Sequence, residues 1–428
     1  MSGLAEILLD AGFTVSGSDA HETELTRHLT EKGARIYYGQ RAANIEQEPG
    51  IQAVVYTAAI HGDNPELMAV RAKGLPELLG ELMRNYKQSI AIAGTHGKTT
   101  TTSMLTDILL AGGTDPTISV GGILKDIGGN IRVGGPEFFV TEACEYTNTI
   151  EVILNIEEDH LDFFKDIADI RHSFRLFAEK LPAGGLLVIN KDIDRVEEIT
   201  RGLNCRVITF GKDPSSDYTA GNITYDELGR PSYDLIVQGE VVNRISLGVT
   251  GEHNVYNSLS AIAVALELGV GFDGVIAGLR KFTGTDRRFE KKGEIGGVTV
   301  IDDYAHHPQE ISATLKAAEN YPHKRLWVVF QPHTYTRTKA FLDEFAQALS
   351  GADEVILADI FAARETDTLG VSSRDIAERL EKLGTSVHYI PSFDEIETFI
   401  LEHCIHGDLL ITMGAGDIVK VGEKLLGL

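Results

Sequence analysis

The feature that most constrains this chain is a glycine-rich loop between an apolar run and a helical pattern. Ser89–Ala93 reads as a short buried strand, and Thr99–Ala111 carries apolar side chains at helical spacing. Between them stands the loop Gly94-Thr95-His96-Gly97-Lys98-Thr99. A strand, two glycines, a Lys-Thr pair and a helix in this order predict a phosphate-binding loop in an α/β domain.

Each residue type in such a loop has a physical task. Glycines let the backbone wrap phosphate oxygens, the Lys98 ammonium spreads the charge of the terminal phosphates, and the Thr99 hydroxyl can bind Mg²⁺. Only two residues separate the glycines, where the usual loop has about four. A turn capped by threonines is the structural alternative. The residues that we expect at the phosphates of ATP are Gly94, Thr95, His96, Gly97, Lys98, Thr99 and Thr100.

Short β-rich runs alternate with helical patterns along the rest of the chain, which predicts parallel α/β layering. The expected strands are Phe138–Thr141, Val152–Ile156, Leu186–Asn190, Val298–Ile301, Leu326–Phe330, Glu354–Ala358, Ser386–Ile390 and Leu409–Met413. Tyr233–Leu247 is expected to form a hairpin and Asn257–Leu268 a helix. A break near Gly284–Arg288 separates two such units.

A chain of 428 residues is too long for one ordinary core, so we expect an α/β protein of three domains. The expected domains are an N-terminal Rossmann-like unit (1–88), a central P-loop ATPase-type unit (89–286) and a C-terminal Rossmann-like unit (287–428). In the first, Leu4–Ala11 reads as a helix, and Thr14–Ser16 and Ala53–Tyr56 read as strands. A Rossmann-like unit should open with a strand and a Gly-rich turn; we expect both to be missing here.

Composition excludes several classes of partner. With 39 basic and 63 acidic residues the net charge is −24, which argues against a nucleic-acid surface. A mean hydropathy of −0.04, and no apolar run near the ~20 residues of a membrane helix, argue against a membrane partner. No basic segment precedes the first apolar residues, so we expect a cytoplasmic protein. We also expect a monomer or homodimer that acts on small molecules.

Acidic and imidazole side chains follow two of the expected strands. Glu142 ends the strand Phe138–Thr141, and Asp159-His160 follows Val152–Ile156. The carboxyl ends of parallel strands meet at one edge of a sheet, so these groups should lie above the phosphates. With Thr99 they predict a Mg²⁺ or Mn²⁺ site at Thr99, Glu142 and His160. Acidic residues at strand ends are also common without a metal.

Two further segments each keep two interpretations. His253, Asn254 and Asn257 open a helix, where the amides suit either adenine or a helix N-cap. Arg287 and Arg288 stand at the domain break, where they suit either a phosphate clamp or an interdomain salt bridge.

Two loops of the C-terminal unit are rich in polar side chains. Asp302–Pro308 and Gln331–Thr338 each follow a strand, at the edge where open α/β sheets bind ligands. Substrate positioning and loop packing both remain open for these loops. A zinc site is conceivable, but adjacent histidines such as His306 and His307 seldom bind one metal together.

Taken together, the motifs resemble those of the Mur ligases of peptidoglycan synthesis. They are GTHGKTTTTSM (94–104), EACEY (142–146), NIEEDHLDFF (155–164), GEHNVYN (251–257), DDYAHHP (302–308) and FQPHTYTRT (330–338), in the family's order. Related ligases carry a carbamoylated lysine near the position of Phe174, and its absence is typical of the alanine-adding branch.

The resemblance implies an ATP-dependent amide ligase that joins L-alanine to UDP-N-acetylmuramate through an acyl phosphate, with Mg²⁺ or Mn²⁺. Lys98, His160 and Arg337 would be catalytic. The implied ATP contacts beyond the loop are His253, Asn254, Asn257, Arg288 and Asp303. Tyr304, His306, His307 and Arg337 would hold the amino acid, and Ser2, Gly3, Asp19, Thr57, Ala58 and Ala59 the UDP-sugar.

Three alternatives stay open. A ligase that attaches a preformed tripeptide to the same sugar shares much of the motif set, but the FQPHTYTRT loop favours the alanine enzyme. A folate polyglutamylating enzyme would not need an N-terminal UDP unit. From another class, a truncated and catalytically inactive nucleotide-binding relative would keep the loop and lose the turnover.

Overall fold

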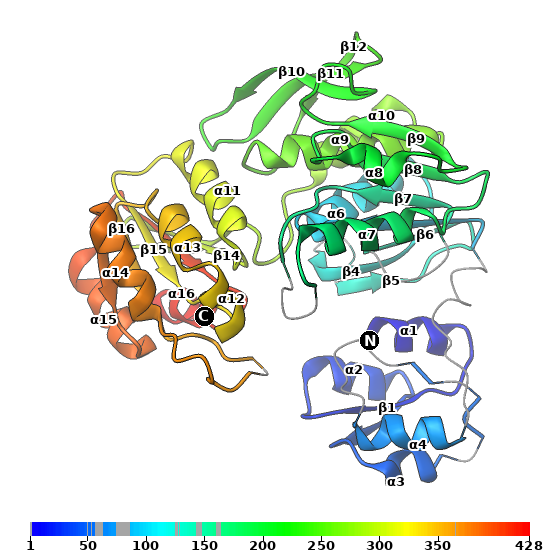
Figure 1. The fold of residues 1–428 in the computed structure, drawn as a ribbon, viewed down its shortest axis with the longest axis horizontal. Coiled ribbons are helices and arrows are strands. Elements are labelled where there is room, and N and C mark those ends of the chain that lie inside the picture. The colour runs from blue at the N-terminus through cyan, green and yellow to red at the C-terminus, as the bar shows by residue number, and fades with distance from the viewer. Residues whose placement is uncertain are drawn as a thin grey trace.

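The strands of the described residues form three separate sheets. A computed structural model describes residues 2–48, 50–52, 54–55, 63–73, 86–124, 127, 129–142, 148–159, 164–363 and 365–428. Its sheets have two, ten and six strands, in order along the chain. In Figure 1 the first is blue, the second runs from cyan to green, and the third runs from yellow to red. The expected three-part α/β architecture is confirmed. The predicted domain boundary after residue 88 falls at the first residue of strand β3 (Gln88–Ala93). The boundary after residue 286 falls between helix α10 (Phe272–Lys281) and strand β13 (Glu290–Ile295).

The N-terminal unit is built on two parallel strands, which pair from Ser16 with Arg35 to Asp19 with Tyr38. Its elements are α1 (Ser2–Asp10), β1 (Ser16–Asp19), α2 (Glu24–Glu31), β2 (Arg35–Tyr38), α3 (Ala42–Glu46) and α4 (Pro65–Lys73). The strand expected at 14–16 therefore lies later in the sequence, because pairing with β2 extends it through Gly17, Ser18 and Asp19. Ala53 and Tyr56, the ends of the other expected strand, lie outside the described residues.

The central unit carries a mixed ten-stranded sheet in the order β12-β11-β10-β9-β8-β7-β3-β6-β4-β5. Its strands are β3 (Gln88–Ala93), β4 (Thr117–Leu124), β5 (Gly129–Arg132), β6 (Phe138–Glu142), β7 (Ile150–Ile153), β8 (Leu186–Asn190), β9 (Arg206–Phe210), β10 (Tyr218–Tyr225), β11 (Pro231–Val237) and β12 (Glu240–Ser246). Its helices are α6 (Lys98–Ala111), α7 (Ile167–Ala178), α8 (Val196–Thr200), α9 (His253–Glu267) and α10 (Phe272–Lys281).

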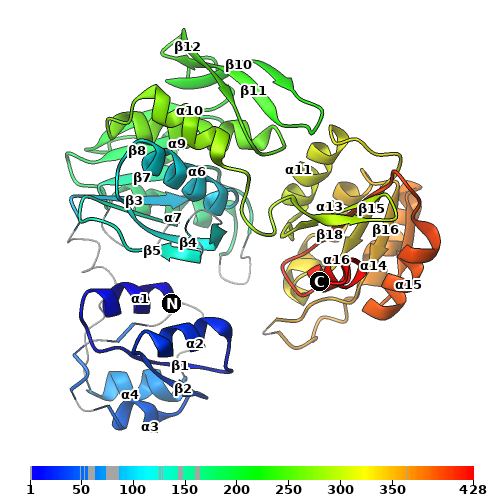
Figure 2. The same ribbon diagram turned by 180° about the vertical axis from the view of Figure 1, so that it is seen from behind.

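Helices cover both faces of this sheet (Figures 1 and 2). Strand β8 shows why, since its side chains alternate in direction. Leu186 and Val188 belong to the core shared with α6, α9 and α10, whereas Leu187 and Ile189 pack with residues of α7 and α8. Both faces are therefore apolar, as a parallel sheet between helices requires.

Several expectations for this unit are corrected. Strand β7 spans residues 150–153, not 152–156, so residues 154–156 form the start of the loop that leads to the site. Helix α9 begins at His253, one turn before the expected start, and ends at Glu267. Strands β4, β5, β9 and β10 were not expected, and neither was β13 of the next unit.

The C-terminal unit has a six-stranded sheet in the order β13-β14-β18-β15-β16-β17, parallel except for β13. Its strands are β13 (Glu290–Ile295), β14 (Val298–Asp303), β15 (Leu326–Phe330), β16 (Glu354–Leu357), β17 (Ser386–Tyr389) and β18 (Leu409–Met413). Its helices are α11 (Pro308–Glu319), α12 (Tyr335–Ala340), α13 (Leu342–Leu349), α14 (Ser373–Leu383), α15 (Phe393–His403) and α16 (Val419–Leu426). Two buried clusters, one on each face, make it an α/β sandwich.

Among the described residues, no helix combines the length and the apolar character that a membrane crossing requires.

One buried carboxyl makes the stability of the central sheet depend on pH. Glu151 of β7 is 0% exposed, and Asn148 Nδ2 donates to its Oε1 at 3.4 Å. Burial raises the pKa of Glu151 from 4.5 to about 8, although the Asn148 hydrogen bond and Lys180 act in the other direction. The folded protein therefore holds a proton that the unfolded chain releases.

We expect Glu151→Gln to remove this pH dependence. In the wild type the stabilising effect is complete below pH 4.5 and is lost as pH rises to about 8, by roughly 1.4 kcal/mol per pH unit. The melting temperature of the variant minus that of the wild type should therefore increase from pH 5 to pH 8. Glu137→Gln, at a side chain 56% exposed, is the control. A difference that stays constant with pH would contradict this account.

Candidate functional site

The phosphate loop has the backbone shape that its glycines allow. Gly94 and Gly97 have φ angles of +148° and +84°, which side chains disfavour. A Cβ atom on Gly97 would lie 2.6 Å from Oδ1 of Asn257, so the loop runs directly against α9. The structure thus brings the predicted loop and one predicted adenine residue together. The Asn155 side chain fixes the loop further, accepting from the His96 amide at 2.8 Å and donating to its carbonyl at 3.0 Å.

Lys98 folds back over this loop. Its Nζ donates to the carbonyl oxygens of Gly94 at 2.6 Å and Thr95 at 2.9 Å. Burial lowers the pKa of Lys98, while Glu142 and Glu310 act to raise it. An ammonium group held above the N-terminus of the 14-residue helix α6 is a strong anion site. These residues therefore fit the phosphates of a nucleotide.

Thr99 and Glu142 each lie close to one of two neighbouring glycines in the middle of β4. Oε1 of Glu142 accepts from the Gly121 amide at 2.7 Å, and a Cβ on Gly122 would lie 3.1 Å from Cγ2 of Thr99. Hydroxyl and carboxylate oxygens are the donors that Mg²⁺ prefers, so both residue types fit the predicted metal, and their joint role as ligands stays a prediction. His160, the third predicted ligand, lies outside the described residues.

The polar start of α9 faces the loop without capping the helix. Asn257 Nδ2 donates to Asn254 Oδ1 at 3.0 Å, and Asn254 Nδ2 donates to the Thr250 carbonyl at 2.7 Å. Glu252 is the N-cap residue, and its side chain makes no capping bond. The N-cap interpretation of these asparagines is therefore wrong. His253 stands exposed beside them.

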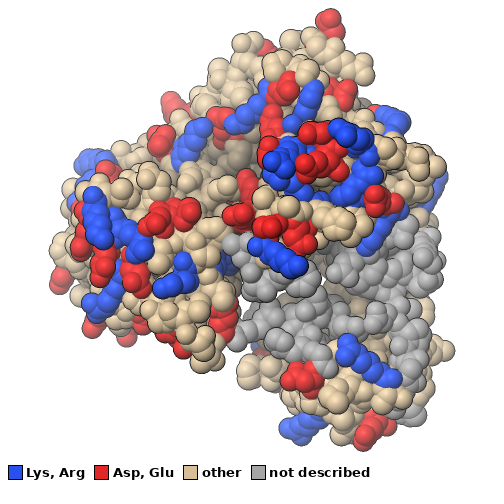
Figure 3. Space-filling model, in the orientation of Figure 1, with Lys and Arg blue, Asp and Glu red and all other residues tan. Residues whose placement is uncertain are grey.

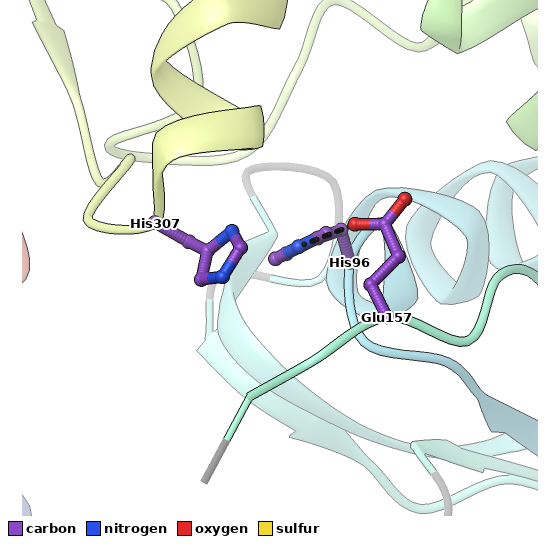
Figure 4. Close-up of side chains that lie close together, drawn as sticks. All are labelled: His96, Glu157 and His307. Carbon is purple, nitrogen blue, oxygen red and sulfur yellow. Dashed lines mark ion pairs between the residues drawn. The ribbon is translucent and has the colours of Figure 1, made fainter. Parts of the chain in front are cut away.

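His96 joins the phosphate loop to the C-terminal unit. Its Nδ1 lies 3.0 Å from Oε1 of Glu310 on α11, and its Nε2 lies 3.1 Å from Oε2 of Glu157 (Figure 4). Burial alone would lower the pKa of His96, but the two carboxylates raise it to about 9. The imidazole is therefore protonated at neutral pH and is held between two negative charges.

His307 lies inside the same interface. It is 4% exposed, and its ring lies 4.9 Å from that of His96 and 5.0 Å from that of Phe341. Its Nε2 lies 3.0 Å from the Glu158 carbonyl, while its Nδ1 accepts from the Gln309 amide at the start of α11. The predicted contact of His307 with an amino acid stays a prediction, since both ring nitrogens have partners here.

Arg337 forms a second link between the two units. It donates to Oδ1 of Asp159 through Nη2 at 2.8 Å and Nε at 3.3 Å, and the two side chains are only 11% and 12% exposed. The His306 ring lies 5.4 Å from Tyr304 and 5.8 Å from His333. The predicted amino-acid residues Tyr304 and His306 thus cluster at the carboxyl end of β14, with His333 as an unpredicted neighbour.

The two arginines at the domain break have different surroundings. Arg287 binds Asp302 at 3.0 Å and the carbonyls of Gly414 and Gly416, all within the C-terminal unit. The interdomain salt bridge is therefore wrong for Arg287, whereas its role as a phosphate clamp stays a prediction. Arg288 lies 3.9 Å from Glu310 and is the arginine that faces the site.

Asp303 is a buried carboxyl next to this break. It accepts from the amides of Phe289 at 2.9 Å and Ala305 at 2.7 Å. Burial raises its pKa to about 6, against the effect of Arg288 and these amides. Its predicted contact with the nucleotide remains a prediction.

The residues predicted for the UDP-sugar are spread over the N-terminal unit. Ser2 opens α1, and a Cβ on Gly3 would overlap Ile131 of β5, so Gly3 packs against the central sheet. Asp19 ends β1, where its carboxylate accepts from the Ala20 amide at 2.7 Å. Thr57, Ala58 and Ala59 lie outside the described residues.

Sequence reasoning missed several residues of this site: Gly121, Gly122, Asn155, Glu157, Glu310 and His333. Asn155 and Glu157 stand inside a motif that we had singled out, so their spacing from His160 was a usable signal. Glu310 had none, because it is 214 residues away from its partner His96.

Comparison with known proteins matches the whole chain to one family. Residues 1–87 match the family model "Mur ligase family, catalytic domain", residues 92–265 "Mur ligase middle domain", and residues 287–416 "Mur ligase, glutamate ligase domain". A UDP-N-acetylmuramate–L-alanine ligase of Lachnospira eligens is 61% identical over 100% of this chain and 95% of that protein. The protein of the same name from Agathobacter rectalis is 57% identical with the same coverage.

Solved structures agree with these sequences. The crystal structure of a UDP-N-acetylmuramate–alanine ligase from Thermotoga maritima has a TM-score of 0.81 at 28% identity and covers 100% of this chain and 96% of that one. A murein peptide ligase from Psychrobacter arcticus has a TM-score of 0.70 at 26% identity, with the same coverage.

We expect Gly97→Ala to abolish ATP binding with little loss of fold. Its Cβ would meet Asn257 Oδ1 at 2.6 Å in a backbone conformation that alanine disfavours, so the loop must move. Gly113→Ala is the matched control, because φ is +77° there and no atom lies within 4 Å of the added Cβ. Both substitutions place alanine at a positive φ angle, but calorimetric titration should detect ATP binding only in the control. Equal ATP affinity in the two variants would contradict the assigned loop.

A second expectation concerns the Asp159–Arg337 pair. Asp159→Asn leaves a nearly buried guanidinium without a balancing charge, at a cost of roughly 2–5 kcal/mol. The two units should then separate more often, and small-angle X-ray scattering should give a larger radius of gyration. Lys316→Met removes the exposed Lys316–Glu252 pair across the same two units and should leave the scattering unchanged. Identical curves for both variants would refute a closing role for Asp159.

Proposed function

The chain belongs to the Mur ligase family, and on that premise we propose that it joins L-alanine to UDP-N-acetylmuramate in a reaction that consumes ATP. The names of the full-length relatives support this substrate pair. The observation that carries the proposal is the contact between His96 of the phosphate loop and Glu310 of α11, 3.0 Å apart. It joins the elements proposed for the nucleotide and for the amino acid at one place, as a coupled reaction requires.

The chemistry explains why ATP is needed. A free carboxylate does not acylate an amine at neutral pH, because oxide is a poor leaving group. In the proposed reaction an oxygen of the sugar's carboxylate attacks the γ-phosphorus, and the bond to ADP breaks. The resulting acyl phosphate has phosphate as its leaving group.

In this step Lys98 would balance the charge on the phosphates, together with the amides at the start of α6. Thr99 and Glu142, with His160, would hold Mg²⁺, which spreads the negative charge of the phosphates when bound. Asn254, Asn257 and His253 would contact the adenine, and Arg288 and Asp303 would approach the nucleotide from the C-terminal unit.

The second step forms the amide. The amine of L-alanine attacks the acyl carbon, phosphate leaves, and the amine loses a proton. Tyr304, His306 and Arg337 would hold the amino acid, with Arg337 as the partner of its carboxylate. Closure of the C-terminal unit through Asp159 and Glu310 would exclude the water that hydrolyses an acyl phosphate. A cytoplasmic location and a monomeric or homodimeric state remain predictions.

Phosphate release in the presence of Mg²⁺ tests this proposal. We expect release from ATP only when UDP-N-acetylmuramate and an amino acid are both present, with L-alanine the best. Lys98→Ala should abolish release without loss of secondary structure. Turnover that is equal or faster with the tripeptide L-alanyl-γ-D-glutamyl-meso-diaminopimelate would favour the peptide-attaching ligase, and no release with any pair would favour an inactive relative.

A further inference from the structure

A second metal site, separate from the predicted site at Thr99 and Glu142, is suggested by three side chains at the interface of the two units. The potential ligand atoms of His96, Glu157 and His307 all lie within 4.8 Å of one another. Figure 4 shows them side by side, with His96 between the other two. His96 and Glu157 belong to the central unit, and His307 precedes α11 of the C-terminal unit.

Both histidines are held as metal-binding histidines usually are. Metal-bound imidazoles donate their other ring N–H to a carboxylate or a carbonyl, which fixes the ring and the tautomer. Nδ1 of His96 faces the Glu310 carboxylate at 3.0 Å, and Nε2 of His307 faces the Glu158 carbonyl at 3.0 Å. Nε2 of His96 is therefore left for a metal. Nδ1 of His307 accepts only a 3.4 Å hydrogen bond from the backbone N–H of Gln309, which a bound metal would displace.

The His96 nitrogen that faces the cluster is poorly satisfied by protein groups. Nε2 is buried, and among the described residues it has no hydrogen-bond partner. Glu157 Oε2 lies 3.1 Å away, close enough for an ion pair but without the direction of a hydrogen bond. Two ligand atoms of one tetrahedral zinc ion, each about 2.0–2.1 Å from the metal, lie at a similar separation.

We propose that His96, Glu157 and His307 form a Zn²⁺ site that ties the phosphate loop to the C-terminal unit. Two imidazole nitrogens and one carboxylate oxygen suit Zn²⁺ and leave a fourth position for water or an anion. Mg²⁺ prefers oxygen ligands and would not compete there. The metal takes the place of the His96 proton between Nε2 and Glu157. Because His307 comes from the other unit, bound Zn²⁺ holds the two units together.

The test uses the full chain with Zn²⁺ alone. Protein is dialysed against Zn²⁺ with excess Mg²⁺ and no nucleotide, gel-filtered and analysed for metal. We expect one zinc per chain. Co²⁺ in its place should give the visible absorption of a four- or five-coordinate ion with nitrogen ligands. Absence of retained zinc, or a Co²⁺ spectrum of an octahedral aqua ion, would overturn the proposal.

Three variants distinguish the proposed zinc ligands from the residue that only orients one of them. Glu157→Gln and His307→Asn each remove a ligand, and asparagine at 307 keeps a favourable cap for α11. Each should weaken zinc by at least ~100-fold, since loss of a supporting partner alone costs 10–100-fold. The Glu310 side chain also accepts from the His307 backbone N–H at 3.3 Å and so caps α11. Glu310→Gln keeps an acceptor for this cap but removes the carboxylate on Nδ1 of His96, so a loss of ~10–100-fold is expected.

His172→Asn, at an exposed histidine of α7, should leave the zinc affinity unchanged. Circular dichroism checks that each variant is folded. Wild-type affinity in both folded ligand variants would refute the site. These measurements need no turnover, so they succeed or fail independently of the proposed ligase reaction.

Discussion

The arrangement of the two larger units depends on the acidic segment Glu157–Asp159, which follows β7. Glu157 pairs with His96 of the phosphate loop, the Glu158 carbonyl faces His307, and Asp159 binds Arg337. Three consecutive residues thus contact the loop, the start of α11 and α12. The segment follows the buried strand β7, which anchors it to the sheet. Its contacts therefore hold groups that are far away in the sequence close to that sheet. Without this segment, the His96–Glu310 contact would be the main remaining link between the phosphate loop and α11.

The core strands could be predicted from the sequence, because burial alone decides them. Strands β8, β15 and β18 agree with expectation at both ends, and every residue of β15 and β18 is buried. Strand β13, with the sequence EKKGEI, was missed since its side chains are polar and only pairing with β14 makes it a strand. Strand β1 was misplaced for a related reason. Glycine, serine and aspartate are residues typical of turns, but Gly17, Ser18 and Asp19 are in a strand because they pair with β2.

The residues of the candidate site also fall into those that local sequence predicts and those that only tertiary packing brings together. The phosphate loop is local, so its glycines, Lys98 and Thr99 could be identified from their order alone. The position of Glu142 at the carboxyl edge of the sheet followed from the rule that parallel strands end at one edge. The contact of His96 with Glu310 obeys no such rule, because it forms only when one unit packs on another. Arg337 illustrates the limit: its residue type suggested an anion partner, and the structure adds a carboxylate of the protein itself, Asp159.

A net charge of −24 is compatible with a site for anionic substrates because the charges act locally. Acidic and basic side chains are interspersed over the described parts of the face in Figure 3. Exposed charges are screened within about 10 Å at moderate salt, so the surface excess has little effect at the loop. Inside the site, Lys98 rests on the carbonyls of Gly94 and Thr95. Phosphate oxygens can replace these carbonyls without moving the ammonium far, so the loop is already arranged for its ligand and little reorganisation opposes binding.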